Sequence, residues 1–244
     1  MITMLEEFCL NAWPSLQTQF YDGWILRFAE GYTRRSNSVS PLYPSKRNLA
    51  QKIQDCESNY QSRNLPVIFK MTSAVHPENL DQQLNARGYQ MDAMTSVQTV
   101  PLADLEFPTS PKYKLFTQID DTWVNAFCTM GKLSEHRRSI MLRILENITN
   151  QFCYILVEKN GQPVATGLGV MEHGYVGLYD ILTHEEHRNQ GYGKAVVNAI
   201  LNWAKQNGAH TSYLQVMCNN PPALHLYEKI GYKEVYTYWY RVKK

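Results

Sequence analysis

Hydrophobic positions follow two different spacings along the chain, and the change of spacing predicts its elements. Apolar residues recur every three to four positions over Leu49–Tyr60 and again at Leu80 and Leu84, which predicts two amphipathic helices. Apolar runs at 66–71 and 95–100 predict short strands. Residues 101–112 hold three prolines among acidic and small polar residues. This composition predicts a boundary between two parts of the chain.

Beyond that boundary the pattern predicts strands and helices in a regular order. Trp123 with Phe127 marks one helix, and Ile140, Ile144 and Ile148 mark a second. The predicted elements are a strand at 114–119, these two helices, a hairpin of 152–158 and 163–171, a strand at 175–183, a helix at about 193–206, a strand at 212–217, a helix at about 221–229 and a strand at 232–242.

A glycine-containing turn lies between the strand at 175–183 and the helix that follows it. It reads Arg188-Asn-Gln-Gly-Tyr-Gly-Lys194. Backbone N–H groups can converge at such a turn, and the helix dipole and two basic side chains favour an anion there. A Walker loop is excluded because Ala195 follows Lys194, and a dinucleotide fingerprint is excluded because Val196 replaces its third glycine. The turn therefore predicts a different kind of phosphate-binding loop.

The sequence resembles the GNAT superfamily of acyl-CoA N-acyltransferases over about residues 112–242. The resemblance rests on Arg-x-x-Gly-x-Gly at 188–193 and on Asn220-Pro-Pro-Ala-Leu-His-Leu-Tyr-Glu-Lys-Ile-Gly-Tyr232, one helix and one strand later. It implies an α/β fold with the mixed sheet of the family and a GNAT acetyltransferase domain at 112–244. It also implies that acetyl-CoA is the acyl donor, and that the acetyl group moves to an amine by direct attack in a ternary complex.

The resemblance further implies which residues bind acetyl-CoA. The backbone at the end of a splayed strand would pair with the pantetheine arm, Asn220 would contact the same arm, and Tyr227 would bind there and protonate the departing thiolate. A phenol suits that last role because its pKa lies close to that of a thiol. The implied cofactor-binding residues are Ile181, Leu182, Thr183, Arg188, Asn189, Gln190, Gly191, Tyr192, Gly193, Lys194, Asn220 and Tyr227.

The general base is less clear from the sequence. The family often places a carboxylate or histidine on the splayed strand, at positions that match Gly177 and Tyr179 here. Gly177 has no side chain, and strict strand alternation would point Asp180 to the opposite, apolar face. We therefore expect deprotonation of the amine through water, with Tyr179 as the second catalytic residue. A non-catalytic acyl-CoA-binding or sensing module is the alternative function.

The N-terminal part weakly repeats the C-terminal end. Ala86-Arg-Gly-Tyr89 follows its helix as Lys229-Ile-Gly-Tyr232 follows the other, although glycine is also a common residue after any helix. We expect a tandem or pseudo-dimeric arrangement in which residues 1–104 form an incomplete GNAT-like domain without a phosphate loop. This domain should line the acceptor pocket, while residues 112–244 alone should still bind acetyl-CoA. The residues expected nearest to the acceptor are Tyr32, Arg34 and Arg35, the alternative for the arginines being a solvated surface or an ion pair between the halves.

Composition narrows the classes of partner. The chain is 44% hydrophobic and 19% charged, with a net charge of +2 and no run of basic residues, so neither nucleic acid nor a membrane is expected as a partner. Five scattered cysteines without a Cys-x-x-Cys pair indicate reduced thiols and no metal site. No signal peptide or membrane-spanning segment is evident. We expect a cytoplasmic monomer or homodimer that acetylates a small-molecule amine.

Overall fold

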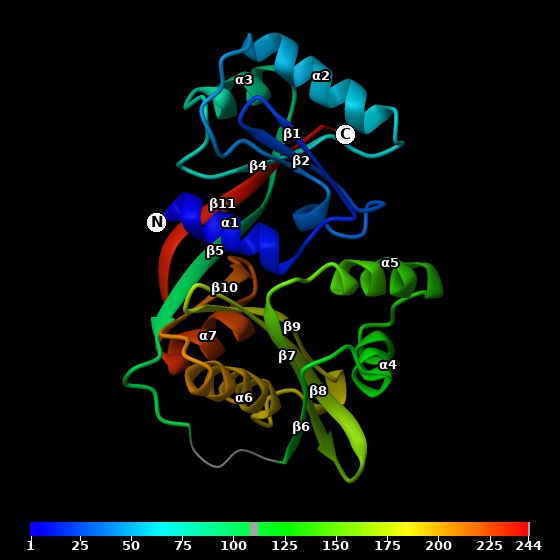
Figure 1. The fold of residues 1–244 in the computed structure, drawn as a ribbon, viewed down its shortest axis with the longest axis vertical. Coiled ribbons are helices and arrows are strands. Elements are labelled where there is room, and N and C mark those ends of the chain that lie inside the picture. The colour runs from blue at the N-terminus through cyan, green and yellow to red at the C-terminus, as the bar shows by residue number, and fades with distance from the viewer. Residues whose placement is uncertain (108–111, 244) are drawn as a thin grey trace.

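The computed structural model describes residues 1–107 and 112–243, and its strands form a single mixed sheet (Figure 1). The three prolines of the predicted boundary lie at 101, 108 and 111, and the last two are outside the described residues. The N-terminal elements are α1 (Ile2–Ala12), β1 (Gln17–Tyr21), β2 (Trp24–Phe28), the 3-10 turn η1 (Arg34–Ser36), β3 (Val39–Ser40), α2 (Leu49–Gln61), β4 (Ile68–Met71), α3 (Leu80–Ala86) and β5 (Gln90–Pro101).

The C-terminal elements appear in the order that the sequence predicts. They are β6 (Tyr113–Phe116), α4 (Asp121–Met130), α5 (Glu135–Glu146), β7 (Gln151–Lys159), β8 (Gln162–Glu172), β9 (Tyr175–Thr183), the 3-10 turn η2 (Glu185–His187), α6 (Tyr192–Gln206), β10 (Thr211–Met217), α7 (Pro221–Ile230) and β11 (Lys233–Val242). The phosphate loop falls between β9 and α6, as expected.

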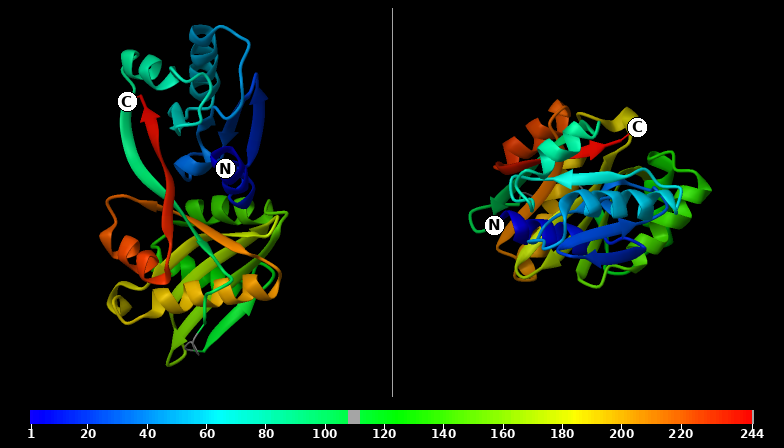
Figure 2. Two further views of the ribbon diagram at one scale, coloured as in Figure 1. Left: turned by 90° about the vertical axis from the view of Figure 1, so that its left-hand side faces the viewer. Right: turned by 90° about the horizontal axis from the view of Figure 1, so that it is seen from above.

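The two halves interleave their last strands. The strand order is β1-β2-β3-β4-β11-β5-β10-β9-β8-β7-β6, so β5 lies between β10 and β11 while β11 lies between β4 and β5. Both strands run between the two lobes of the molecule (Figure 2). Each follows a helix and a Gly-Tyr pair, Gly88-Tyr89 before β5 and Gly231-Tyr232 before β11. This confirms a tandem arrangement and shows that neither half completes its part of the sheet alone; the domain limits 1–104 and 112–244 remain a prediction.

Helices cover both faces of the C-terminal part of the sheet. On one face α6 and α7 pack in a cluster with Val196, Ile200 and Tyr227, which we call the α6 cluster. On the other face α1, α4 and α5 enclose what we call the central cluster. The central cluster draws on both halves of the chain, and its members include Trp13, Tyr32, Trp123, Phe127, Met141, Ile144, Tyr154, Leu168, Tyr179 and Tyr213.

Helix α1 holds the halves together through buried polar contacts as well as apolar ones. Glu6 is fully buried and forms an ion pair of 2.6 Å with Lys70 of β4. The hydroxyl of Tyr236 in β11 donates to the same carboxylate at 2.6 Å. At the end of α1, the Trp13 ring stacks on Tyr179 of β9 at a centroid distance of 6.1 Å. These contacts fix α1 over the face of the sheet that carries the central cluster.

Candidate active site

Strands β9 and β10 run parallel and then separate, which opens the sheet. Their pairing extends from Tyr175–Thr211 to Leu178–Leu214 and stops there. β9 continues to Thr183, and within the described part of the chain this second half pairs only with β8. A cavity of about 530 Å³ lies beside the free edge. An unpaired strand edge next to a cavity can bind an extended chain of amides as another strand would.

The residues predicted to bind acetyl-CoA gather at this cavity, with one exception. Those that line it are Ile181, Leu182, Thr183, Arg188, Asn189, Gly191, Tyr192, Gly193, Lys194, Asn220 and Tyr227. Gln190 points elsewhere, because its side chain accepts from Lys159 Nζ at 3.3 Å and donates to the Glu186 carbonyl at 3.2 Å. The lining residues that the sequence did not assign to the site are His187, Pro222, Ala223 and Leu226.

The loop before α6 has a backbone suited to an anion. Gly191 caps the helix at φ +85°, a conformation that side-chain-bearing residues rarely adopt. The first turn of α6 therefore starts at the cavity and presents N–H groups that have no partner within the helix. Arg188 and Lys194 line the same cavity with exposed side chains. The helix dipole, the free N–H groups and the two positive side chains therefore all favour binding of an anion at the start of α6.

Helix α7 contributes an amide and a phenol to the other wall. The side-chain oxygen Oδ1 of Asn220 accepts from the Ala223 N–H at 3.3 Å and caps the helix, which leaves the side-chain NH₂ group of Asn220 for a ligand. Tyr227 lines the cavity with only 8% of its surface exposed. Burial raises the pKa of Tyr227 to about 12. The hydroxyl is protonated at neutral pH, as a proton donor must be, although burial makes it a weaker acid than a free phenol.

A β-bulge in β9 turns the Asp180 side chain to the face opposite to the one expected from strict alternation. Across β8, Thr166 pairs with Leu182 and Leu168 pairs with Tyr179, so Asp180 and Ile181 together face a single residue. The bulge puts Asp180 at φ +50° and shifts the alternation beyond it. Ile181 then packs in the α6 cluster and Leu182 against the central cluster, the reverse of strict alternation.

Asp180 itself faces the side of the central cluster. Burial and then the Asp180 carboxylate raise the pKa of Tyr32 to about 12, and the same two causes raise the pKa of Tyr154. Burial raises the pKa of Asp180 from 3.8 to about 6, and the Arg35 guanidinium offsets part of that rise. The prediction that Asp180 points away from Tyr179 was wrong, because alternation across the strand fails at a bulge.

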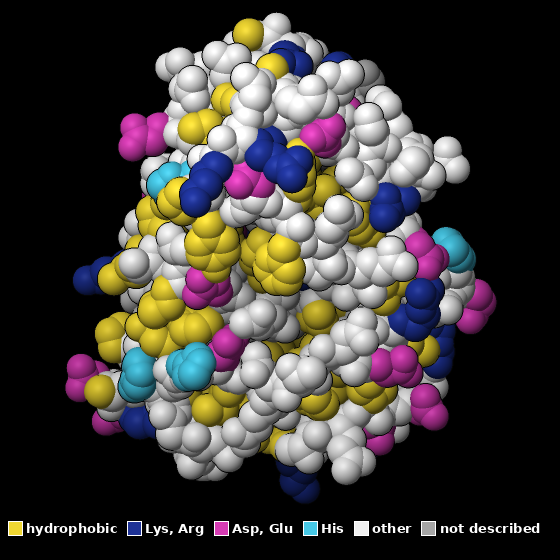
Figure 3. Space-filling model, turned by 45° about the horizontal axis from the view of Figure 1, so that its top comes forward, with side chains coloured by type: hydrophobic (Ala, Val, Ile, Leu, Met, Phe, Trp, Pro, Cys, Tyr) yellow, Lys and Arg dark blue, Asp and Glu magenta, His cyan; other side chains and the backbone are white. Residues whose placement is uncertain are grey.

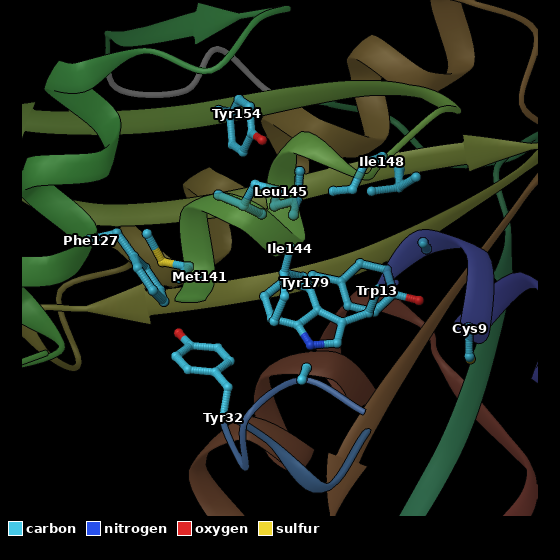
Figure 4. Close-up of a cluster of buried hydrophobic side chains, with 14 of the residues drawn as sticks. Cys9, Trp13, Tyr32, Phe127, Met141, Ile144, Leu145, Ile148, Tyr154 and Tyr179 are labelled. Carbon is cyan, nitrogen blue, oxygen red and sulfur yellow. The ribbon is translucent and has the colours of Figure 1, made fainter. Parts of the chain in front are cut away.

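Polar atoms without partners collect on this face. Asp180 Oδ2, the Tyr154 hydroxyl and the Thr166 hydroxyl are buried and make no hydrogen bond with any described residue. The Tyr32 hydroxyl makes none to another residue of the described ranges either, and the ring projects from its loop toward Phe127, across from Tyr179 (Figure 4). Buried polar groups are nearly always paired in folded proteins, so such a group points to water or a ligand.

Gly177 and Tyr179 form part of the wall beside this group. A Cβ at Gly177 would come within 2.6 Å of the rings of Tyr179 and Tyr213, so no carboxylate fits at that position. The Tyr179 hydroxyl donates to the Tyr213 hydroxyl at 3.2 Å, and only 2% of Tyr179 is exposed. The catalytic role of Tyr179 stays a prediction; its geometry suits the positioning of neighbouring groups.

The two arginines of the N-terminal loop have different surroundings. Arg34 forms an exposed ion pair with Asp92 at 2.6 Å. Arg35 is half-buried, with its guanidinium 5.1 Å from the Trp13 ring centroid and 5.8 Å from that of Tyr179. In the described ranges no carboxylate or carbonyl pairs with the Arg35 guanidinium. The structure therefore brings Arg35 and Tyr32, but not Arg34, to the face that carries Asp180.

Other features limit the kinds of ligand. The residues that the structure describes include no group of three or more His, Cys, Asp or Glu side chains that could hold a metal ion. None of the described helices is long and apolar enough to cross a membrane. On the face seen in Figure 3, basic and acidic side chains are interspersed among apolar ones.

Comparison with known proteins finds relatives over the full length. A family model described as "Probable histone acetyltransferase Rv0428c C-terminal" matches residues 1–241. The uncharacterized N-acetyltransferase YobR of Bacillus subtilis is 30% identical over 249 residues, covering 100% of this chain and 99% of the relative.

Several solved structures share the fold. A GCN5-related N-acetyltransferase from Kribbella flavida has a TM-score of 0.73 at 15% identity, over 99% of this chain and 95% of its own. A tandem GNAT protein from the clavulanic acid biosynthesis pathway has a TM-score of 0.61 at 12% identity, over 83% and 75% of the two chains. At these identities the likeness is one of fold alone.

Proposed function

This chain belongs to the Rv0428c C-terminal acetyltransferase family and is a GNAT-type N-acetyltransferase, and on that premise we propose that it moves the acetyl group of acetyl-CoA to a primary amine of a small molecule. The observation that carries the proposal is the cavity between β9 and α7. It combines a free strand edge, an anion-binding helix start and a buried phenol. The strand edge suits the amides of an acyl-CoA, the helix start suits its pyrophosphate, and the phenol suits its thioester end.

The residues at the cavity fit the donor. Arg188, Lys194 and the first turn of α6 would hold the pyrophosphate, and the backbone of 181–183 would pair with the pantetheine amides. Asn220 would add a hydrogen bond through its free amide donor. Acetyl-CoA supplies the acetyl thioester; the protein supplies binding, orientation and proton transfer.

Proton transfer falls to Asp180 and Tyr227. Attack by the neutral amine forms a C–N bond, breaks the C–S bond and moves one proton from nitrogen to sulfur. Asp180 accepts the proton of the amine on the side of the central cluster, and a base with a pKa of about 6 is well matched to neutral pH. Tyr227 donates a proton to the thiolate from the α7 side, and both groups then exchange protons with water. Asp180 replaces the water-mediated deprotonation that alternation suggested.

The alternative function is an acyl-CoA-binding module without catalysis. It was supported by Gly177, because glycine provides no side chain that could act as the base. That support weakens, because tyrosine rings fill the place of a Gly177 side chain and the bulge supplies a carboxylate three residues later. The description of the matched family names a histone as acceptor for Rv0428c. For this chain we favour a small amine, because the loop that carries Tyr32 and Arg35 covers the face of Asp180.

The test is amine-dependent release of CoA. Purified protein is incubated with acetyl-CoA and a panel of primary amines, and free thiol and acetylated product are both measured. We expect product and thiol in equal amounts. Binding of acetyl-CoA without amine-dependent thiol release would favour the sensing module. All five cysteines are free thiols, four of them buried, and with this chemistry we expect the enzyme to act in the cytoplasm.

A further inference from the structure

Two opposite charges lie on the acceptor side of the sheet without meeting. Asp180 Oδ2 is buried with no hydrogen-bond partner, and the guanidinium of Arg35 pairs with no carboxylate among the residues described. Both charges lie near Tyr179, because Asp180 follows it in β9 and the Arg35 guanidinium is 5.8 Å from its ring centroid, yet they form no ion pair. Removing a single charge from water is energetically costly. Each of these two unpaired charges would therefore be stabilised by a ligand group of opposite charge.

The pose of Arg35 is fixed for binding. The guanidinium carbon lies 5.1 Å from the Trp13 ring centroid and 5.8 Å from the Tyr179 ring centroid, and contact with the aromatic rings holds the guanidinium while leaving its N–H groups free for a ligand. Hydrogen bonds hold the loop beneath it. Asn37 accepts from the N–H groups of Ala29 and Gly31 at 2.8 and 2.9 Å, and Arg27 donates to the Arg35 carbonyl at 2.6 Å. A planar fork held in this way matches a carboxylate.

We propose that the acceptor carries a carboxylate on the same molecule as its amine, as a free amino acid does, and that Arg35 binds this carboxylate while Asp180 faces the amino group. The proposal rests on the function proposed above and specifies its substrate class. One zwitterion satisfies both charges at once. The Tyr154 hydroxyl, which is buried without a partner within the described ranges, and the Tyr32 hydroxyl lie on the same face as Asp180 and add hydrogen-bond partners for the same ligand.

The proposed carboxylate binding by Arg35 depends on the position of its guanidinium as well as on its charge, as a comparison with Arg34 shows. Arg34 is the sequence neighbour of Arg35, but its side chain is exposed and neutralised by Asp92 at 2.6 Å. Arg35 has no such partner in the described chain and faces the interior between the halves. A carboxylate that enters beside Tyr179 therefore meets Arg35.

The experiment compares free L-amino acids with the matching amino acid amides as acceptors. Each pair presents the same amine, but only the acid has a negative charge; the amide has the more readily deprotonated amine, so intrinsic reactivity favours the amide. We expect kcat/KM to be about 10- to 100-fold higher for the acid of a preferred pair, the range for a hydrogen bond to a charged group. Arg35→Gln should remove that preference mainly through KM, and Arg35→Lys should restore part of it.

Arg47→Gln is the matched control, since Arg47 is exposed on the N-terminal half over the Tyr21 ring; it should leave the preference unchanged. Equal use of acids and amides by the parent, or a preference that survives Arg35→Gln, overturns this inference and leaves the acetyltransferase proposal standing. Acetylation confined to peptide lysines also overturns it. If acetyl-CoA binds but no amine releases thiol, the proposed function fails and this inference fails with it. Unfolding curves for each variant confirm that the comparison is made on folded protein.

Discussion

Asp180→Asn should make the protein more stable and nearly inactive. Burial raises the pKa of Asp180 from 3.8 to about 6, and each pKa unit corresponds to about 1.36 kcal/mol. Because the folded pKa is raised, the unfolded chain loses its proton first. Stability therefore falls as pH rises from about 4 to about 6 and stays reduced above that. Asparagine is neutral and close in shape, so it should remove a cost of about 3 kcal/mol at pH 8 and about half of that at pH 5.

Denaturant unfolding of parent and variant at pH 5 and pH 8 measures this difference. Activity should fall by about 10²- to 10⁴-fold, the range for loss of a general base, and the rise of the parent's kcat/KM through about pH 6 should disappear. Asp104→Asn makes the same change at an exposed position and should alter neither property. A variant that gains no stability between pH 5 and pH 8 would refute the buried ionised carboxylate. Activity within a few-fold of the parent would refute its role as base.

Three further predictions concern the donor site and the interleaved sheet. Tyr227→Phe removes one proton and little volume, so kcat should drop by about 10²- to 10⁴-fold with acetyl-CoA affinity nearly unchanged; an unchanged kcat assigns Tyr227 to packing. Gly193→Asp should abolish acetyl-CoA binding in calorimetry by charge repulsion, whereas Gly193→Ala, whose Cβ lies 3.3 Å from Thr183 Oγ1, should retain most of it; similar losses in both would disprove an electrostatic cause. A chain of residues 112–244 should fail to fold by circular dichroism, because it lacks β5 between β10 and β11; a folded fragment that binds acetyl-CoA would contradict this.

Local motifs were readable from the sequence, and contacts between distant segments were not. The phosphate loop and the Asn220–Tyr232 stretch carry their glycines, charges and caps within a dozen residues, so their place beside one cavity could be predicted. The bulge at Asp180 depends on the register of β9 against β8, which no property of β9 alone reveals. The donor side of the site could therefore be predicted from the sequence, and the carboxylate on the acceptor side could not.

The arrangement of the N-terminal half could likewise be predicted only in part. The repeated Gly-Tyr after α3 and α7 indicated the tandem arrangement, but the exchange of β5 and β11 is a pairing between halves and left no local signal. It removes the basis for expecting residues 112–244 to bind acetyl-CoA alone. Helix α1 is not among the predicted elements, although Leu5, Phe8, Cys9 and Ala12 recur at helical spacing and are buried.

The most direct test of the account is a turnover measurement on the intact protein with acetyl-CoA and a panel of primary amines. Mass spectrometry identifies acetylated amine, and a thiol assay measures released CoA in the same sample. We predict one acetylated amine for each CoA released, with no release when the amine is omitted. Tight acetyl-CoA binding in calorimetry together with no amine-dependent thiol release would contradict it.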